Sequence, residues 1–150
     1  MPNRATHVVT SSGIGLLFAA HKAGDQPEPA RVCELAGGLL GGCVGGRAPD
    51  ICEPPISPRH RGSYHSVAVG GMLLKVCNKE LDEWQRACRR WADDFARRRA
   101  LVPTDSVQAL LLTLAEIACR MLVGFIAGFL AGYVTHLSLD ACTPNCIALV

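Results

Sequence analysis

The sequence contains few charged and few aromatic residues. Of its 150 residues, 19% are Asp, Glu, Lys or Arg and 5% are Phe, Trp or Tyr, whereas soluble domains carry about 25% charged residues. Hydrophobic residues make up 49% of the chain. This composition favours closely packed helices, including helices in lipid, where small residues let backbones approach. The length suits a single domain, residues 1–150.

The low net charge, the absence of a phosphate-binding motif and the apolar setting of several cysteines each argue against one class of protein. A net charge of +2 is too small to indicate binding to nucleic acid. The glycine-rich stretch "GGLLGGCVGG" lacks the Lys-Ser/Thr ending of a phosphate-binding loop, so its glycines are expected to serve close helix packing. Cys43, Cys77 and Cys119 lie in apolar runs, where free cysteine behaves as a small hydrophobe. A disulfide framework is therefore not expected.

Four apolar segments, residues 8–20, 35–44, 66–77 and 107–139, are expected to be helices. Only the last exceeds the roughly 20 residues needed to cross a bilayer. The first resembles a signal peptide, but polar residues interrupt it, and a retained helix is the alternative that we favour. The sequence predicts an all-α, membrane-associated bundle of about four apolar helices and one basic amphipathic helix.

The amphipathic helix is predicted over residues 78–100, as an insert. Leu81, Trp84, Cys88, Trp91 and Phe95 recur at steps of three and four, which places them on one helical face. The opposite face is basic and holds Arg86, Arg89, Arg90, Asp93, Arg97 and Arg98. A basic helix with tryptophans on its apolar side suits a membrane interface. A helix packed on a soluble core gives the same pattern, so both interpretations stay open.

Polar residues that are distant in the chain are expected to meet at one end of this bundle. If the four helices run up and down in order, one side collects His7, Asp50, Glu53, His60, His65, His136 and Asp140. His136 and Asp140 share a helical face because they are four residues apart. His60 and His65 require a bend, which Gly62 allows. Imidazoles and carboxylates are ligands for zinc, manganese or iron, and such a site lowers the pKa of a bound water to about 7. Each residue alone is equally compatible with a helix cap or a turn.

Three segments, "GGCVGGRAPDICEP", "HRGSYHS" and "AGYVTHLSLDACTPNCIALV", resemble the YdjM-like family of membrane-bound, metal-dependent hydrolases, some of them linked to LexA regulation. The family pattern is an early histidine, a Pro-Asp-x-Asp-His stretch, an HRGxxHS motif and a late His-x-x-x-Asp before Thr-Pro. The resemblance implies functional roles for His7, Asp50, His60, Arg61, His65, His136 and Asp140.

The chain departs from this pattern at two positions, where Cys52 replaces the second aspartate and Glu53 replaces the following histidine. Both residue types can bind metal, although Cys is the softer ligand. The departure leaves three alternatives open, namely a single ion in place of two, a preference for zinc, or a loss of activity. Cys52 is thus a further candidate ligand.

The predicted function is metal-dependent hydrolysis of an ester or phosphoester at a membrane. His7, Asp50, Glu53, His65, His136 and Asp140 are the expected ligands. His60 would be a further ligand or the general acid, and Arg61 would stabilise negative charge. Expected partners are membrane lipid and a small or lipid-linked substrate, with no nucleic acid and with homo-oligomers allowed. The alternative is a non-catalytic membrane binding protein whose metal site is structural or degenerate.

Basic residues predict the orientation of a multi-pass protein in the bacterial inner membrane. Four of them lie on the side of the candidate ligands, and nine lie on the other side, seven of these in the basic helix. Because positive residues favour the cytoplasm, the site is expected to face the periplasm.

Overall fold

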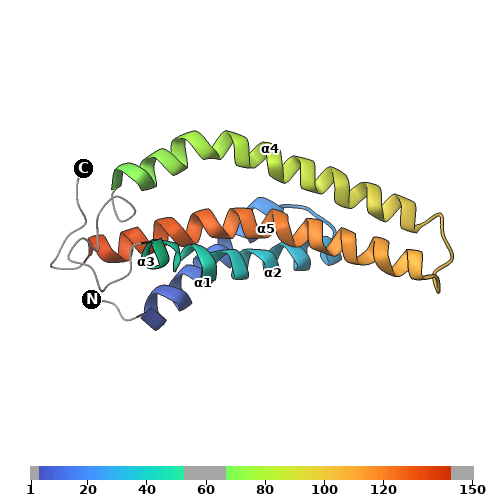
Figure 1. The fold of residues 1–150 in the computed structure, drawn as a ribbon, viewed down its shortest axis with the longest axis horizontal. Helices are drawn as coiled ribbons and strands as arrows, with labels where there is room; N and C mark the ends of the chain where they lie inside the picture. The colour runs from blue at the N-terminus through green and yellow to red at the C-terminus, as the bar shows by residue number, and fades with distance from the viewer. Residues whose placement is uncertain (1–3, 53–66, 143–150) are drawn as a thin grey trace.

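The computed structural model of the protein describes residues 4–52 and 67–142, and in this part of the chain every regular element is a helix. The helices are α1 (Arg4–Ala23), α2 (Glu28–Gly45), α3 (Ala48–Cys52), α4 (Val67–Arg99) and α5 (Val107–Ala141) (Figure 1). The predicted all-α architecture is confirmed. The apolar run at 66–77 and the basic helix that follows it form one continuous helix, α4, without an interruption at Asn78.

Local sequence explains where the main helices begin. Pro27 is the N-cap of α2 and a second proline occupies its first turn, where a missing backbone N–H costs nothing. Ser106 caps α5, since its Oγ accepts a hydrogen bond from the Ala109 N–H at 3.1 Å. Within the described residues, α5 is the one helix that is long and apolar enough to cross a membrane.

Glycines bring α2 and α5 into direct backbone contact. Each helix presents three glycines at four-residue steps, and a Cβ atom at any of them would overlap the backbone of the other helix. The six residues are Gly37, Gly41 and Gly45 on α2, and Gly124, Gly128 and Gly132 on α5. Helices approach this closely only where side chains are absent. The predicted role of the α2 glycines is confirmed, and the α5 glycines complete it.

The remaining face of α2 packs on α1 in the same way. Gly38 and Gly42 lie against the α1 backbone near Gly15 and Ser11. Ser11 is fully buried, and its hydroxyl donates to the Gly132 carbonyl of α5 at 3.2 Å. As a result α2 is held between α1 and α5, and this three-helix unit sets where the helix ends lie.

The fourth long helix, α4, packs antiparallel to α5 along its length (Figure 1). Its inward face consists of Gln85, Cys88 and Ala92, and the Gln85 amide donates to the Val123 carbonyl at 2.9 Å. Trp84 and Trp91 are 65% and 58% exposed. Of the two interpretations that the sequence left open for the Trp-containing face, packing on the protein core holds for Cys88 but for neither tryptophan.

Ion pairs attach α4 to the rest of the bundle. Glu34 of α2 is 1% exposed and accepts two hydrogen bonds from the Arg89 guanidinium, at 2.7 and 3.1 Å. Arg89 also donates to the Lys22 carbonyl at 2.9 Å. Arg89 was predicted on the solvent face of the helix, but it points inward because Glu34 is a buried charge that requires a partner.

Three further ion pairs join α4 to the other helices. Lys22 of α1 contacts Asp82 at 2.9 Å. On α5, Arg120 contacts Asp93 at 2.9 Å and Glu116 at 3.3 Å, and Glu116 also binds Arg99 at 3.0 Å. Positive and negative groups thus alternate across the α4–α5 interface.

We expect Gly128→Ala to lower the free energy of unfolding by about 1–3 kcal/mol, because the new methyl group forces α2 and α5 apart. Gly13→Ala is the matched control, since a Cβ at Gly13 meets no atom within 4 Å. It should stabilise the protein by about 0.5–1 kcal/mol through helix propensity. Circular dichroism of denaturant unfolding in detergent measures both. Equal changes in the two variants would show that the glycine contacts do not hold the helices together.

We expect Glu34→Ala to lower the free energy of unfolding by about 3 kcal/mol, because it leaves the Arg89 guanidinium without its carboxylate partner. Glu28→Ala, which removes an exposed carboxylate 3.8 Å from Arg31, should change it by less than about 0.5 kcal/mol. The same unfolding assay applies, and a Glu34→Ala effect as small as that of the control would contradict the assigned role.

Candidate metal centre

A buried cluster of two histidines and one aspartate lies where the start of α1 meets the end of α5. His7, His136 and Asp140 are 5%, 1% and 4% exposed. Asp140 lies 3.5 Å from His7 Nε2 and 3.4 Å from His136 Nε2, and the two imidazole rings stack with their centroids 4.2 Å apart. One ligand atom from each of the three side chains lies within 4.8 Å of the other two.

A fourth candidate ligand comes from α3. The Asp50 carboxylate lies 3.6 Å from His136 Nε2 and is about one-third exposed. The short helix α3 follows α2 after a two-residue break, and Pro49, which is buried, packs it against the bundle. Asp50 therefore forms the partly exposed side of an otherwise buried cluster.

The backbone of α2 orients the central histidine. His136 Nδ1 lies 2.7 Å from the Gly46 carbonyl. A carbonyl only accepts hydrogen bonds, so Nδ1 carries the proton and donates it. In the neutral ring Nε2 then holds the lone pair, which faces both Asp50 and Asp140. A histidine ligand fixed by a carbonyl at its other nitrogen is the usual arrangement in metal sites, so these residues fit a divalent cation.

The structure brings together four of the predicted site residues, namely His7, Asp50, His136 and Asp140. Cys52 is the last residue of α3 and is exposed. Glu53, His60, Arg61 and His65 lie outside the described residues. The remaining histidine, His21, lies near the end of α1, away from His7 at its start, and is exposed.

Two contributors to the cluster were not predicted. The Gly46 carbonyl orients His136, but a backbone oxygen leaves no signal in the sequence. Ser11, one helical turn after His7, ties α1 to α5 beside the cluster. Its four-residue spacing from His7 was the available signal, because such residues share a helical face.

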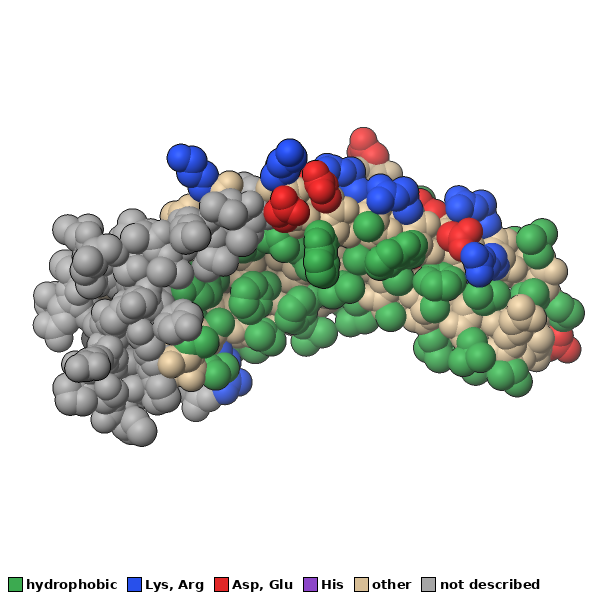
Figure 2. All heavy atoms as spheres, turned by 45° about the horizontal axis from the view of Figure 1, so that its top comes forward, with side chains coloured by type: hydrophobic (Ala, Val, Ile, Leu, Met, Phe, Trp, Pro, Cys, Tyr) green, Lys and Arg blue, Asp and Glu red, His purple; other side chains and the backbone are tan. Residues whose placement is uncertain are grey.

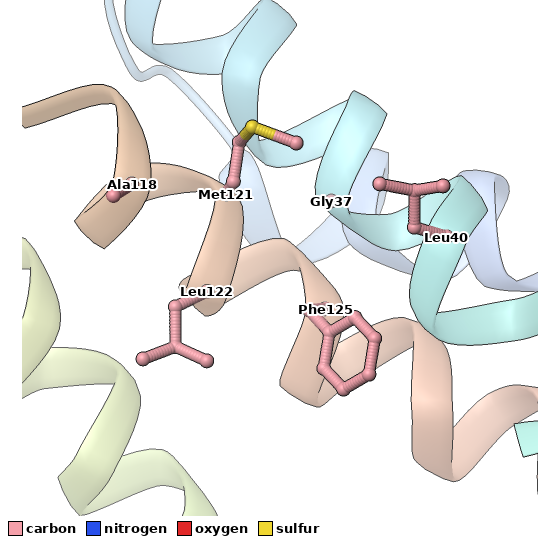
Figure 3. Close-up of a pocket in the computed structure, with 6 residues that line it drawn as sticks. All are labelled: Gly37, Leu40, Ala118, Met121, Leu122 and Phe125. Atoms are coloured by element: carbon pink, nitrogen blue, oxygen red, sulfur yellow. The ribbon is translucent and has the colours of Figure 1, made fainter. Parts of the chain in front are cut away.

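A separate surface depression between α2 and α5 offers no chemistry of its own. It has a volume of about 220 Å³ and is open to the outside. Figure 3 shows its lining, which contains no titratable side chain and consists of Gly37, Leu40, Ala118, Met121, Leu122 and Phe125. We therefore assign the candidate chemistry to the buried cluster.

The fold and the cluster define a class: a small helical protein with many exposed hydrophobic side chains and a buried His/Asp site between its helix ends. The family model described as YdjM inner membrane protein matches residues 1–150. The chain belongs to this family, which confirms the resemblance found in the sequence. No curated protein and no solved structure matches the chain.

Proposed function

We propose that this inner membrane family member is a metal-dependent hydrolase of an ester or phosphoester, and that it binds one divalent cation in the His/Asp cluster. The observation that carries the proposal is the convergence of His7, His136 and Asp140 from opposite ends of the chain into one buried group. Burying three ionisable side chains together costs free energy unless they pair with one another or bind an ion.

Each residue of the cluster would have a different role in such a metal site. His136, oriented by the Gly46 carbonyl, offers Nε2 as a ligand, and Asp140 holds its two oxygens between both imidazoles. Asp50 is the most exposed member and marks the side from which a substrate enters. A bound zinc ion supplies Lewis acidity and an activated water. Zinc suits the nitrogen and oxygen donors, with manganese or iron as alternatives, and a second ion would need ligands outside the described residues.

The remaining parts of the proposal come from the sequence. His60 would act as general acid or further ligand, Arg61 would stabilise negative charge, and Glu53, His65 and Cys52 are further candidate ligands. A lipid-linked substrate fits the membrane location of the family. Several membrane crossings, a periplasmic site and a homo-oligomer also remain predictions from the sequence.

The second candidate function is a structural role for the His/Asp cluster, which is supported by the contacts that His136 makes within it. With both ring nitrogens protonated, His136 donates to the Gly46 carbonyl and carries a positive charge beside Asp50 and Asp140, so the cluster can hold the ends of α2, α3 and α5 together without any ion. In that case the chain is a membrane binding protein that does not turn over a substrate.

We expect zinc to stabilise the purified protein, by about 2.7 kcal/mol at a concentration 100 times its Kd. His7→Ala should abolish this stabilisation, whereas His21→Ala should retain it, because His21 is exposed and near the other end of α1. Thermal unfolding with and without zinc, together with elemental analysis of the bound metal, measures the effect. Equal stabilisation of both variants would place the metal elsewhere.

We expect the zinc-loaded protein to hydrolyse a generic substrate, bis(p-nitrophenyl) phosphate or p-nitrophenyl acetate, in detergent. Asp140→Asn should lower the rate at least tenfold, because it removes the negative charge of a candidate metal ligand that lies beside both imidazoles. Asp25→Asn, which changes an exposed aspartate, is the control. A protein that binds one equivalent of zinc but hydrolyses neither substrate supports the structural role instead.

A further inference from the structure

The paired ends of α4 and α5 extend beyond the rest of the bundle. The glycines of α2 contact α5 from Met121 onward, whereas α5 begins much earlier, at Val107. The first part of α5 contacts α4 instead, where Arg99 binds Glu116 at 3.0 Å. Figure 1 shows this hairpin of two helices extending past the ends of α1 and α2. One side of α5 in the hairpin is therefore left uncovered by the described helices.

The uncovered side of α5 is an exposed apolar stripe. We define the α5 stripe by five residues at steps of three and four, namely Val107, Leu110, Leu111, Leu114 and Ile117. Such spacing makes one continuous face of a helix, and the three leucines of the stripe are 53–60% exposed. Glu116 is the sole charged residue between 107 and 118, and it is turned toward α4. Figure 2 shows hydrophobic side chains gathered at this end of the molecule, below the charged side chains of α4.

The distribution of charge along α5 determines how the α5 stripe lies relative to a bilayer. Crossing a bilayer takes about 20 apolar residues, and residues 121–139 of α5 form such a run without any Asp, Glu, Lys or Arg. The run is bounded by Arg120, which pairs with Asp93 of α4. A span over this run leaves Leu110 about 15 Å outside the hydrocarbon along the helix axis. Acyl chains then do not reach the stripe, and exposed leucines are disfavoured in water.

We propose that the α5 stripe binds the same stripe of a second copy of this chain, in a parallel pair of α5 helices. Two copies in one bilayer share their orientation, so their α5 helices run in the same direction and the same residues face each other across a two-fold axis. Because the stripe has no charge, the two copies meet without burying an unpaired charge. The proposal assigns an interface to the homo-oligomer that the sequence allows, and it does not depend on the proposed hydrolase activity.

The pattern of the stripe specifically suits a parallel helix pair, and it continues past the hairpin. Steps of four and three residues alternate without interruption along Val107, Leu111, Leu114, Ala118, Met121 and Phe125. This alternation is the one by which parallel helices interlock, with side chains of one helix entering holes on the other. The last three positions line the open depression between α2 and α5, of about 220 Å³, which is apolar throughout (Figure 3). In the pair, an apolar side chain of the second copy fills this depression.

Photo-crosslinking locates the contact. The full chain carries p-benzoylphenylalanine in place of Leu110 or Leu114 and, as the matched control, in place of Gln108, which is exposed nearby on α5 but lies outside the stripe. The protein is irradiated in vesicles of phosphatidylcholine and phosphatidylglycerol at a low ratio of protein to lipid. Gel electrophoresis and mass spectrometry identify the products.

We expect covalent dimers from the two stripe positions, at a yield well above that of the Gln108 position. Equal dimer yields at all three positions would overturn the proposal, because they indicate random collision. Adducts of the stripe positions with phospholipid in place of a second chain would overturn it as well, because lipid would then cover the stripe.

Sedimentation equilibrium in a density-matched detergent measures the dissociation constant of the dimer. Leu110→Glu/Leu114→Glu should raise this constant about a hundredfold or more, because the contact would bury unpaired charges. Gln108→Glu should change it by less than about threefold, since the new charge stays in water. Circular dichroism should show unchanged helix content in both variants, because the substituted side chains are exposed. A monomeric wild type, or a dimer that the double variant leaves intact, would contradict the proposed interface.

Discussion

Direct backbone contact between α2 and α5 is the constraint on which the rest of the molecule depends. Gly38 and Gly128 meet without intervening side chains, so the two helices run side by side to the end of α2. Only at this separation does the Gly46 carbonyl come within 2.7 Å of His136 Nδ1. A wider helix pair would move the carbonyl out of hydrogen-bonding range. The geometry of the candidate metal centre is therefore a consequence of glycine packing far along the bundle.

Charged residues, and not glycines, hold α4 against the other helices. Between α4 and the rest of the bundle the attachment is polar, with Glu34 of α2 and Arg120 of α5 as buried groups that need partners. Because an unpaired buried charge is costly, each of these residues selects one rotation and one register of α4. The paired charges turn inward, whereas Lys79, Arg86 and Arg90 stay exposed on α4.

The sequence predicted part of the candidate site well, for identifiable reasons. His136 and Asp140 could be paired from their four-residue spacing, and His7 and Asp50 from the order of the helices along the chain. The resemblance to the YdjM-like family named the same residues, and the family match confirms that membership. The Gly46 carbonyl could not be foreseen, because its role depends on where the end of α2 lies relative to α5.

Three features are determined by local sequence. Hydrophobic periodicity determines the helix content, Pro27 and Ser106 mark where α2 and α5 begin, and the glycines of α2 allow close packing. Local sequence does not determine the rotation of α4 about its own axis. Its tryptophans and leucine lie on one helical face, and their period alone left open whether that face meets the core or a membrane. The structure turns Arg89 inward and leaves Trp84 outside. A buried carboxylate on a different helix, Glu34, decided this, and no periodicity within residues 78–99 contains that information.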